Sequence, residues 1–290
     1  MLISLESTPK ELIKIITDTL NQTGMMFRIF GRLKNKQSLS KKINRDPRYG
    51  DTKKIQDLIG IRVVLYFADD IKCVHQILDN TFTPRKKDES IDDLNLSTET
   101  FKPVRYNLVY EIPNNISSYN QMGDKYKNKI DNTFEIQIRT VLSEGWHEVE
   151  HDLRFKYKDD WNNYPCESRR LNGVYAALET NEWTMIKVLE DIAYQNYKNK
   201  NWESMLRQKF RLRLTDEKLD EKIIEILDNN NDLAKKLYRM ERIVLISTLK
   251  EKDFCYPINL TNLVYFSNIC FFKDENLLSI TPEILKEDCE

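Results

Sequence analysis

Residues 133–140, TFEIQIRT, carry the pattern that most restricts how this chain can fold. Apolar and polar side chains alternate strictly through the segment, as they do in a strand with one buried face. The polar face carries Glu135, Gln137 and Arg139, with successive side chains roughly 6.6–7 Å apart along the strand. We therefore expect a sheet with one apolar, covered face and, on the other, a row of functional groups. A solvated outer face is the alternative.

The composition excludes several classes of protein. Of the 290 residues, 40% are hydrophobic and 31% are charged, which is too apolar for a disordered chain and enough to build a sizeable core. No segment reaches the roughly 18–20 apolar residues of a membrane span, and charges interrupt the N-terminus where a signal peptide is apolar. The five cysteines are odd in number and form no CxxC pair, so neither a disulfide framework nor a cysteine zinc site is indicated. We expect a cytoplasmic protein without a membrane partner.

The order of patterns predicts an α+β fold, in which a mixed sheet has flanking helices. A capped helix begins near Thr8 and ends before Gly24, and a second helix is expected to carry the basic segment that follows. Further strands are expected in the segment 57–67, in 103–112 and in 133–140, with helices over 71–78 and about 141–158.

The second half of the chain has a different texture. Helical periodicity dominates residues 161–250, and the aromatic-rich segment 251–290 is less regular. We therefore expect a first domain over 1–160, a helical module over 161–250 and an irregular tail over 251–290. The module could regulate the first domain, mediate homo-oligomerisation or recognise a target. Its basic run RQKFRLRL (207–214) is typical of a solvated helix face, with nucleic-acid binding as the alternative.

The segment from Arg28 to Lys54 is strongly basic although the whole chain is nearly neutral. Ten lysines and arginines face two aspartates there, a net charge of +8. Such a segment favours polyanions, including nucleoside phosphates and RNA. Asp57 follows directly and could join Glu135. Two carboxylates beside a basic segment are what a magnesium-dependent phosphate-transfer site requires, because the acids hold the ion and the cations hold the phosphates.

Four segments resemble, in the same order, the motifs of RelA/SpoT-type alarmone synthetases. They are RLKNKQSLSKKI (32–43), DLIGIRVV (57–64), FEIQIRT (134–140) and WHEVEHDLRFK (146–156). The resemblance covers residues from about 25 to 160. It implies a nucleotidyltransferase-like fold that moves pyrophosphate from ATP to the 3′-hydroxyl of GTP or GDP and releases AMP. Because the chain begins almost directly with the synthetase-like portion, we expect no hydrolase domain.

The resemblance also implies roles for individual residues. Asp57 and Glu135 would bind Mg²⁺ and, with Arg62 on the ATP side, carry the catalysis. The ATP phosphates would lie on Arg32, Lys34, Ser38 and Lys42, and the nucleotides would lie near Gln137, Arg139 and Lys156.

One motif departs from the family pattern. Where the family has Gly-Tyr-x-Ser-x-His, whose tyrosine stacks on the acceptor guanine, this chain reads FKPVRYNLVYEIP (101–113). Tyr106 is the nearest aromatic residue, and Asn107 stands in the histidine's place. GTP or GDP is the first expectation for the acceptor. The alternatives are an adenosine nucleotide, a tRNA 3′ end modified by a toxin-like enzyme, or a catalytically weakened regulator that only binds nucleotides.

The sequence His147-Glu148-x-x-His151 also matches the zinc-peptidase signature, with Glu179 as a candidate third ligand. His151-Asp152 similarly resembles the metal-binding dyad of alarmone hydrolases, and His75 is the one remaining histidine. Because the synthetase motif already accounts for residues 146–156, we interpret this segment as support for the sheet and the site.

Overall fold

The computed structural model describes residues 5–91, 106–116, 129–215 and 218–289. Two compact units divide the chain. The first comprises residues 1–17 and 27–182, and the second comprises residues 18–26 and 183–290. The boundary falls inside the long helix α5 (Pro165–Lys198).

A five-stranded sheet forms the centre of the first unit, with strand order β1-β2-β5-β4-β3. The strands are β1 (Phe27–Leu33), β2 (Ile59–Leu65), β3 (Ser90–Ile91), β4 (Tyr106–Glu111) and β5 (Thr133–Thr140). β2 and β5 pair in parallel, and the other neighbours are antiparallel. The expected mixed sheet with flanking helices is confirmed.

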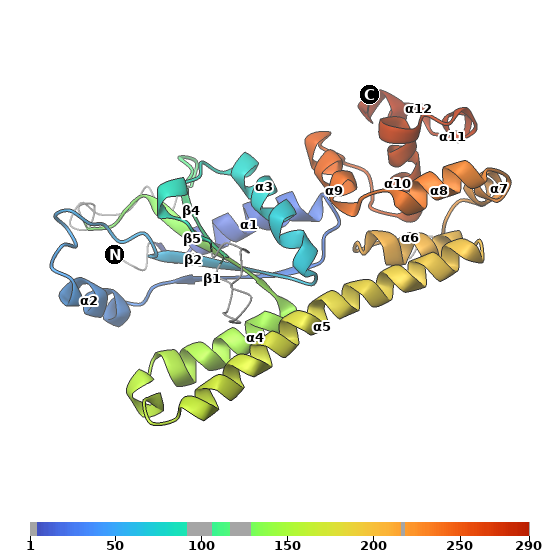
Figure 1. Cartoon of the computed structure of the whole chain (residues 1–290). Helices are drawn as coiled ribbons and strands as arrows, with labels where there is room; N and C mark the ends of the chain where they lie inside the picture. The colour runs from blue at the N-terminus through green and yellow to red at the C-terminus, as the bar shows by residue number, and fades with distance from the viewer. Residues whose placement is uncertain (1–4, 92–105, 117–128, 216–217, 290) are drawn as a thin grey trace. The chain divides into compact units, whose positions relative to one another are not determined.

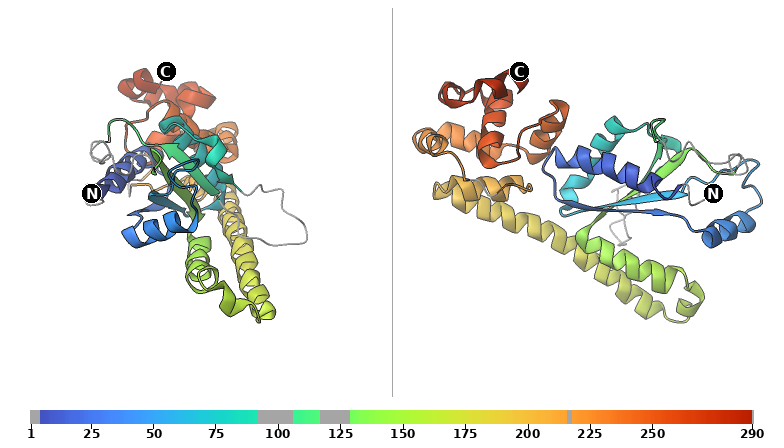
Figure 2. Two further views of the ribbon diagram at one scale, coloured as in Figure 1. Left: turned by 90° about the vertical axis from the view of Figure 1, so that its left-hand side faces the viewer. Right: turned by 180° about the vertical axis from the view of Figure 1, so that it is seen from behind.

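Helices cover the two faces of this sheet unequally. α1 (Thr8–Asn21) and α3 (Ile71–Thr81) lie along one face, and α4 (Val141–Val149) lies on the other side (Figures 1 and 2). Phe134 and Ile136 of β5 are fully buried on the α1–α3 side, where Phe134 packs against Tyr110 and Phe82. The alternation in β5 thus leaves Glu135, Gln137 and Arg139 for the side of α4.

α2 (Lys36–Arg45) places the basic segment beside the start of β2. Asn35 caps this helix by accepting a hydrogen bond from the Ser38 amide at 2.8 Å. A small apolar cluster anchors it to the sheet end, comprising Leu5, Leu39, Tyr49, Ile55, Leu58 and Ile130. Since Leu39 and Leu58 are buried together, the cations of α2 and the residue before Leu58, Asp57, are brought to the same place.

α4 and α5 form a hairpin that starts at the end of β5. Thr140 and Ser143 form a capping box at the start of α4, and Trp146 donates from Nε1 to the Leu171 carbonyl at 2.8 Å. The expected helix over 141–158 is interrupted, because α4 passes into a π-helix (Glu150–Phe155) and then a 3₁₀ turn (Lys158–Trp161).

Two strands were not predicted from the sequence. β1 lies inside the basic segment expected to be helical, and β3 lies in the polar stretch after α3. Only Phe27 of β1 is buried, so its apolar signal is weak. The strand expected over 103–112 is described from Tyr106 onward, and residues 103–105 lie outside the described residues.

The second unit is helical in the residues described. After α5 come α6 (Trp202–Phe210), α7 (Glu221–Asn229), α8 (Asn231–Arg239), α9 (Arg242–Glu251), α10 (Leu260–Ser267), α11 (Glu275–Ile280) and α12 (Glu283–Cys289). The expectation of an irregular tail over 251–290 is wrong, because this segment forms the helices α10, α11 and α12. Their side chains Leu263, Phe266, Leu277 and Leu285 are buried in a hydrophobic core. The basic run 207–214 is not one exposed helix face either, since Phe210 and Arg211 are buried. Among the described residues, each helix is too short or too polar to cross a bilayer.

Candidate active site

The register of the sheet aligns two rows of residues across its α4-facing side. Residues that lie opposite each other on neighbouring strands project to the same face. The first row contains Phe30, Arg62, Gln137 and Asn107, and the second contains Arg32, Gly60, Glu135 and Val109. An acid, an amide and two arginines from three strands are thereby brought together.

A cleft of about 540 Å³ opens over these rows. Most of the residues expected at the site line it, namely Arg32, Lys34, Ser38, Asp57, Arg62, Glu135, Gln137 and Lys156. The lining also contains residues that were not predicted as site residues, among them Phe30 of β1, Glu148 of α4 and His151 of the π-helix. Side chains from the sheet, α2 and the α4 hairpin therefore surround one space.

Two lysines hold the carboxylate of Asp57. Lys34 Nζ lies 2.5 Å from Oδ2, and Lys42 Nζ lies 2.8 Å from Oδ1. Burial alone would raise the pKa of Asp57, but the hydrogen bonds from the two lysines outweigh it, so the pKa is lowered. Burial likewise opposes the charge of Lys42, and Asp57 reverses that effect and raises the lysine pKa. Lys42 thus acts on the acid and does not line the cleft.

Glu135 differs from Asp57 in its electrostatics. Burial raises its pKa, and the negative charge of Asp57 raises it further. Both acids line the same cleft, and a divalent cation between them would relieve the repulsion that Asp57 exerts on Glu135. The donor set suits Mg²⁺, which takes oxygen ligands and commonly uses one or two carboxylates together with substrate phosphates. The residues present therefore fit this ion.

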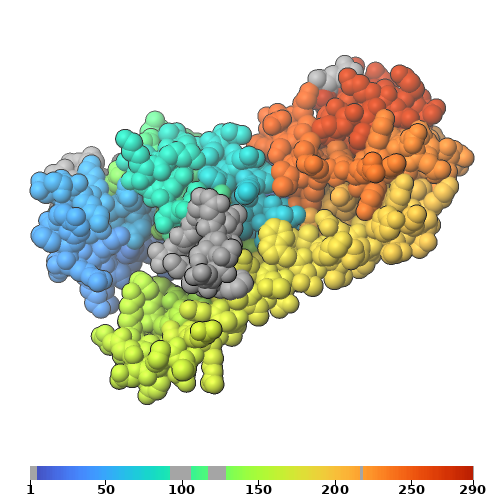
Figure 3. All heavy atoms as spheres, viewed as in Figure 1, coloured from blue at the N-terminus to red at the C-terminus, as the bar shows by residue number. Residues whose placement is uncertain are grey.

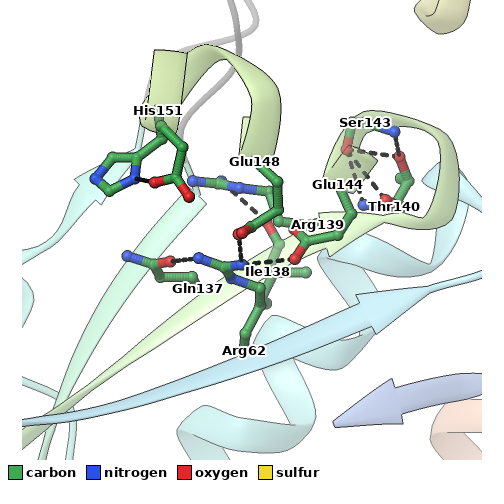
Figure 4. Close-up of polar contacts among 10 residues, drawn as sticks. Arg62, Gln137, Ile138, Arg139, Thr140, Ser143, Glu144, Glu148 and His151 are labelled. Atoms are coloured by element: carbon green, nitrogen blue, oxygen red, sulfur yellow. Dashed lines mark hydrogen bonds and ion pairs between the residues drawn. The ribbon is translucent and has the colours of Figure 1, made fainter. Parts of the chain in front are cut away.

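Arg62 is clamped by acids of α4. Its Nη1 donates to Glu144 Oε1 at 2.6 Å and also contacts Glu148, and its Nη2 lies 3.3 Å from Gln137 Oε1 (Figure 4). Burial would lower the arginine pKa, but the two glutamates raise it. The sequence analysis missed these glutamates as partners, although their i, i+4 spacing on one helix face was a usable signal.

Two expected residues lie elsewhere. Tyr106 lies on the α3 side of the sheet, because the neighbouring residue Asn107 pairs with Gln137 and takes the cleft side. The Tyr106 hydroxyl contacts His75 Nδ1 at 2.7 Å. The expectation that Tyr106 binds nucleotide in this cleft is therefore corrected. Arg139 is half-buried and does not line the cleft. Burial and then Arg62 lower its pKa, and it donates to the Ile138 carbonyl at 3.2 Å.

The His-Glu-x-x-His segment is divided among different surroundings. His147 packs against Trp146 and Tyr175, whereas His151 lines the cleft with Nδ1 2.9 Å from Asp152. Within the described residues, these side chains do not form a three-ligand group with atoms inside 4.8 Å of one another. The segment supports Arg62 and the cleft wall, as the synthetase interpretation expected.

The fold is similar to that of a solved small alarmone synthetase. The structure of small alarmone synthetase 1 from Bacillus subtilis bound to its product pppGpp matches with a TM-score of 0.50 at 22% identity, covering 66% of this chain and 96% of that chain. Small alarmone synthetase 2 from Bacillus subtilis matches with a TM-score of 0.48 at 19% identity, over 66% and 96% of the two chains.

Sequence comparison points to the same group of proteins. Residues 31–160 match the region found in RelA/SpoT proteins. The curated GTP pyrophosphokinase YjbM of Bacillus subtilis (strain 168) is 30% identical over 133 residues, which is 44% of this chain. The match spans 56% of the length of that relative.

Proposed function

We propose that this chain is an ATP-dependent nucleotide pyrophosphokinase that transfers pyrophosphate to the 3′-hydroxyl of GTP or GDP and releases AMP. The observation that carries the proposal is the meeting of Asp57 and Glu135 in one cleft with Arg32, Lys34 and Arg62. The RelA/SpoT region and the relative named GTP pyrophosphokinase support it.

The reaction breaks the bond between the β-phosphorus of ATP and the oxygen that leaves with AMP. A new bond forms from the acceptor 3′-oxygen to that phosphorus, and the hydroxyl proton is lost. Mg²⁺ held by Asp57 and Glu135 would supply a Lewis acid for the phosphate oxygens. Arg32 and Arg62 would neutralise charge on the transferred group and the leaving oxygen. Asp57 could also accept a hydrogen bond from the attacking hydroxyl.

The ion pairs in the cleft indicate how nucleotide and metal would bind. Lys34 and Lys42 are paired with Asp57, and Arg62 is paired with Glu144 and Glu148. An incoming polyphosphate offers each cation an alternative anion. A divalent cation offers Asp57 an alternative positive charge. Nucleotide and metal would therefore bind together by exchange of partners.

An RNA 3′ end is the second candidate acceptor. Leu153, Phe155 and Tyr157 are exposed next to the cleft-lining residues His151 and Lys156. Lys158 Nζ lies 4.6 Å from the centre of the Phe155 ring. Exposed aromatics interleaved with cations are typical of surfaces on which unpaired bases stack.

The test incubates the full chain with Mg²⁺, ATP labelled in the β- and γ-phosphates, and separately GDP, GTP, ADP or bulk tRNA. The proposal expects label on GDP or GTP with one AMP formed per transfer, and strongly reduced transfer by Asp57→Asn. Label on tRNA or on ADP would show that this molecule, and not GTP or GDP, is the acceptor. Nucleotide binding without AMP formation would identify a regulator. Self-association through residues 161–250 stays a prediction, which sedimentation of the full chain measures.

A further inference from the structure

A second cluster of metal-ligating side chains lies on the α3 side of the sheet, away from the cleft. It contains His75 and Asp79, which are one turn apart on α3, and Glu89, which directly precedes β3. One ligand atom from each lies within 4.8 Å of the others. His75 Nε2 and Asp79 Oδ2 are 3.4 Å apart.

Two tyrosines of β4 fix the orientation of two of these groups. The Tyr106 hydroxyl lies 2.7 Å from His75 Nδ1, which leaves Nε2 directed at the cluster. Tyr110 donates to Asp79 Oδ1 at 3.0 Å, which leaves Oδ2 for the same point. Metal-binding histidines and carboxylates are usually held by such hydrogen bonds to their second atoms. The free ligand atoms of His75 and Asp79 are therefore oriented toward a common position.

That point is contacted by a cation of the chain itself. Lys86 Nζ lies 2.6 Å from Asp79 Oδ2, 3.3 Å from His75 Nε2 and 3.3 Å from Glu89 Oε1. The three ligands thus already converge on a single positive charge. The Lys86 side chain is half exposed on the 3₁₀ turn Lys86–Asp88 and can turn outward, whereas that of Glu89 is only 9% exposed.

The charges of the cluster favour a cation with a higher charge than the lysine ammonium. Among the described residues, the two carboxylates of the cluster share one lysine, Lys86, so one negative charge is not balanced there. A divalent ion would balance both acids. Burial lowers the pKa of His75, which favours the neutral ring that can donate its lone pair. One imidazole nitrogen and two carboxylates suit a first-row transition ion such as zinc, whereas magnesium prefers oxygen ligands throughout.

We propose that His75, Asp79 and Glu89 form a zinc site in which Lys86 is a built-in competitor for the metal. When zinc binds, the Lys86 ammonium moves out to solvent and the ion joins α3 to the β3–β4 edge of the sheet. Figure 3 shows the teal segment that contains α3 at the surface of the first unit, where an ion can arrive from solvent. The site is separate from the one proposed for nucleotide transfer.

The test titrates zinc into the full chain in the presence of excess Mg²⁺, which fills oxygen-only sites. The wild type should bind one more equivalent of zinc than His75→Ala and should gain thermal stability on binding. Exposed thiols such as Cys166 and Cys255 contribute equally to both proteins. His151→Ala, the matched histidine control, should bind as many equivalents of zinc as the wild type. Equal stoichiometry and affinity in wild type and His75→Ala would overturn the proposal.

Three further variants distinguish loss of the zinc site from misfolding of the protein. Lys86→Met should bind zinc more tightly than wild type, a gain that a misfolded protein cannot produce, and Lys72→Met, an exposed lysine of α3, should not. Tyr106→Phe should weaken zinc roughly 10- to 100-fold, because it releases the His75 ring. Unchanged zinc affinity in Lys86→Met would show that the lysine and the metal do not share a position, and the site as proposed would be wrong.

Discussion

Lys34 Nζ lies 2.5 Å from Asp57 Oδ2, although the two residues are 23 positions apart in the chain. This contact joins the basic segment to the acid proposed as a metal ligand, and it neutralises that acid in the absence of nucleotide.

Asp57→Asn should reduce pyrophosphate transfer by about 100- to 1,000-fold, the range found when one oriented electrostatic group is removed from an active site. The change keeps the shape of the side chain but removes the charge that a metal requires. Label transfer measures the rate, and circular dichroism checks the fold. Asp51→Asn, an exposed aspartate of the same basic segment, is the matched control and should retain full activity.

Glu135→Gln should abolish transfer and yet stabilise the nucleotide-free protein at neutral pH. Burial and Asp57 raise the pKa of Glu135 in the folded state, so the folded protein binds more protons than the unfolded chain above the ordinary glutamate pKa. The contribution of Glu135 to the free energy of unfolding therefore falls as pH rises from the ordinary glutamate pKa through the raised pKa of the folded state. Melting temperatures should show the gain of the variant at neutral pH, with no gain below the ordinary pKa. A variant less stable than wild type at neutral pH would contradict this account.

Glu148→Gln should tighten binding of a non-hydrolysable ATP analogue by a few-fold. The exposed Glu148 carboxylate competes with phosphate for Arg62, and exposed ion pairs contribute about 0.2–1 kcal/mol. Titration calorimetry measures the affinity. Glu167→Gln, an exposed acid early in α5, should leave it unchanged. Weaker binding in Glu148→Gln would mean that Glu148 helps to hold the nucleotide.

Trp146→Ala should cost about 3–5 kcal/mol of unfolding free energy, as expected when a buried tryptophan is deleted. Its ring is 4% exposed and packs against Tyr175, and its nitrogen bonds the Leu171 carbonyl. Trp183 of the same long helix pair is 55% exposed, so Trp183→Ala should change stability by less than about 0.5 kcal/mol. Denaturant titration compares the two variants, and equal losses would refute the assigned packing.

The sequence predicted β5 to the residue, because a strand with one buried and one polar face repeats every second residue. It did not predict β1, where the segment FRIFGRL buries Phe27 alone and exposes most of the rest. The apolar alternation that marks a strand is absent there, and the density of cations resembled a helical face. The strand that carries Arg32 and Phe30 had to be found from its pairing with β2.

The cleft is lined by the two acids and most of the cations expected from the sequence, but the side of the sheet taken by Tyr106 was not predicted. Successive residues of a strand point to opposite faces, so a one-residue difference in register moves a side chain from one face to the other. The pairing of Asn107 with Gln137 decides this, and pairing between strands distant in sequence is not visible in either segment alone. The same is true of the contacts from Glu144 and Glu148 to Arg62.

The parallel pairing of β2 with β5 also has a consequence during synthesis of the protein. Asp57 and Arg62 are translated well before Glu135, which joins them only when β5 has paired beside β2. A nascent chain that stops between the two strands exposes a phosphate-attracting basic arm without the second acid. The two proposed metal ligands therefore meet only after β5 has been synthesised and has paired beside β2.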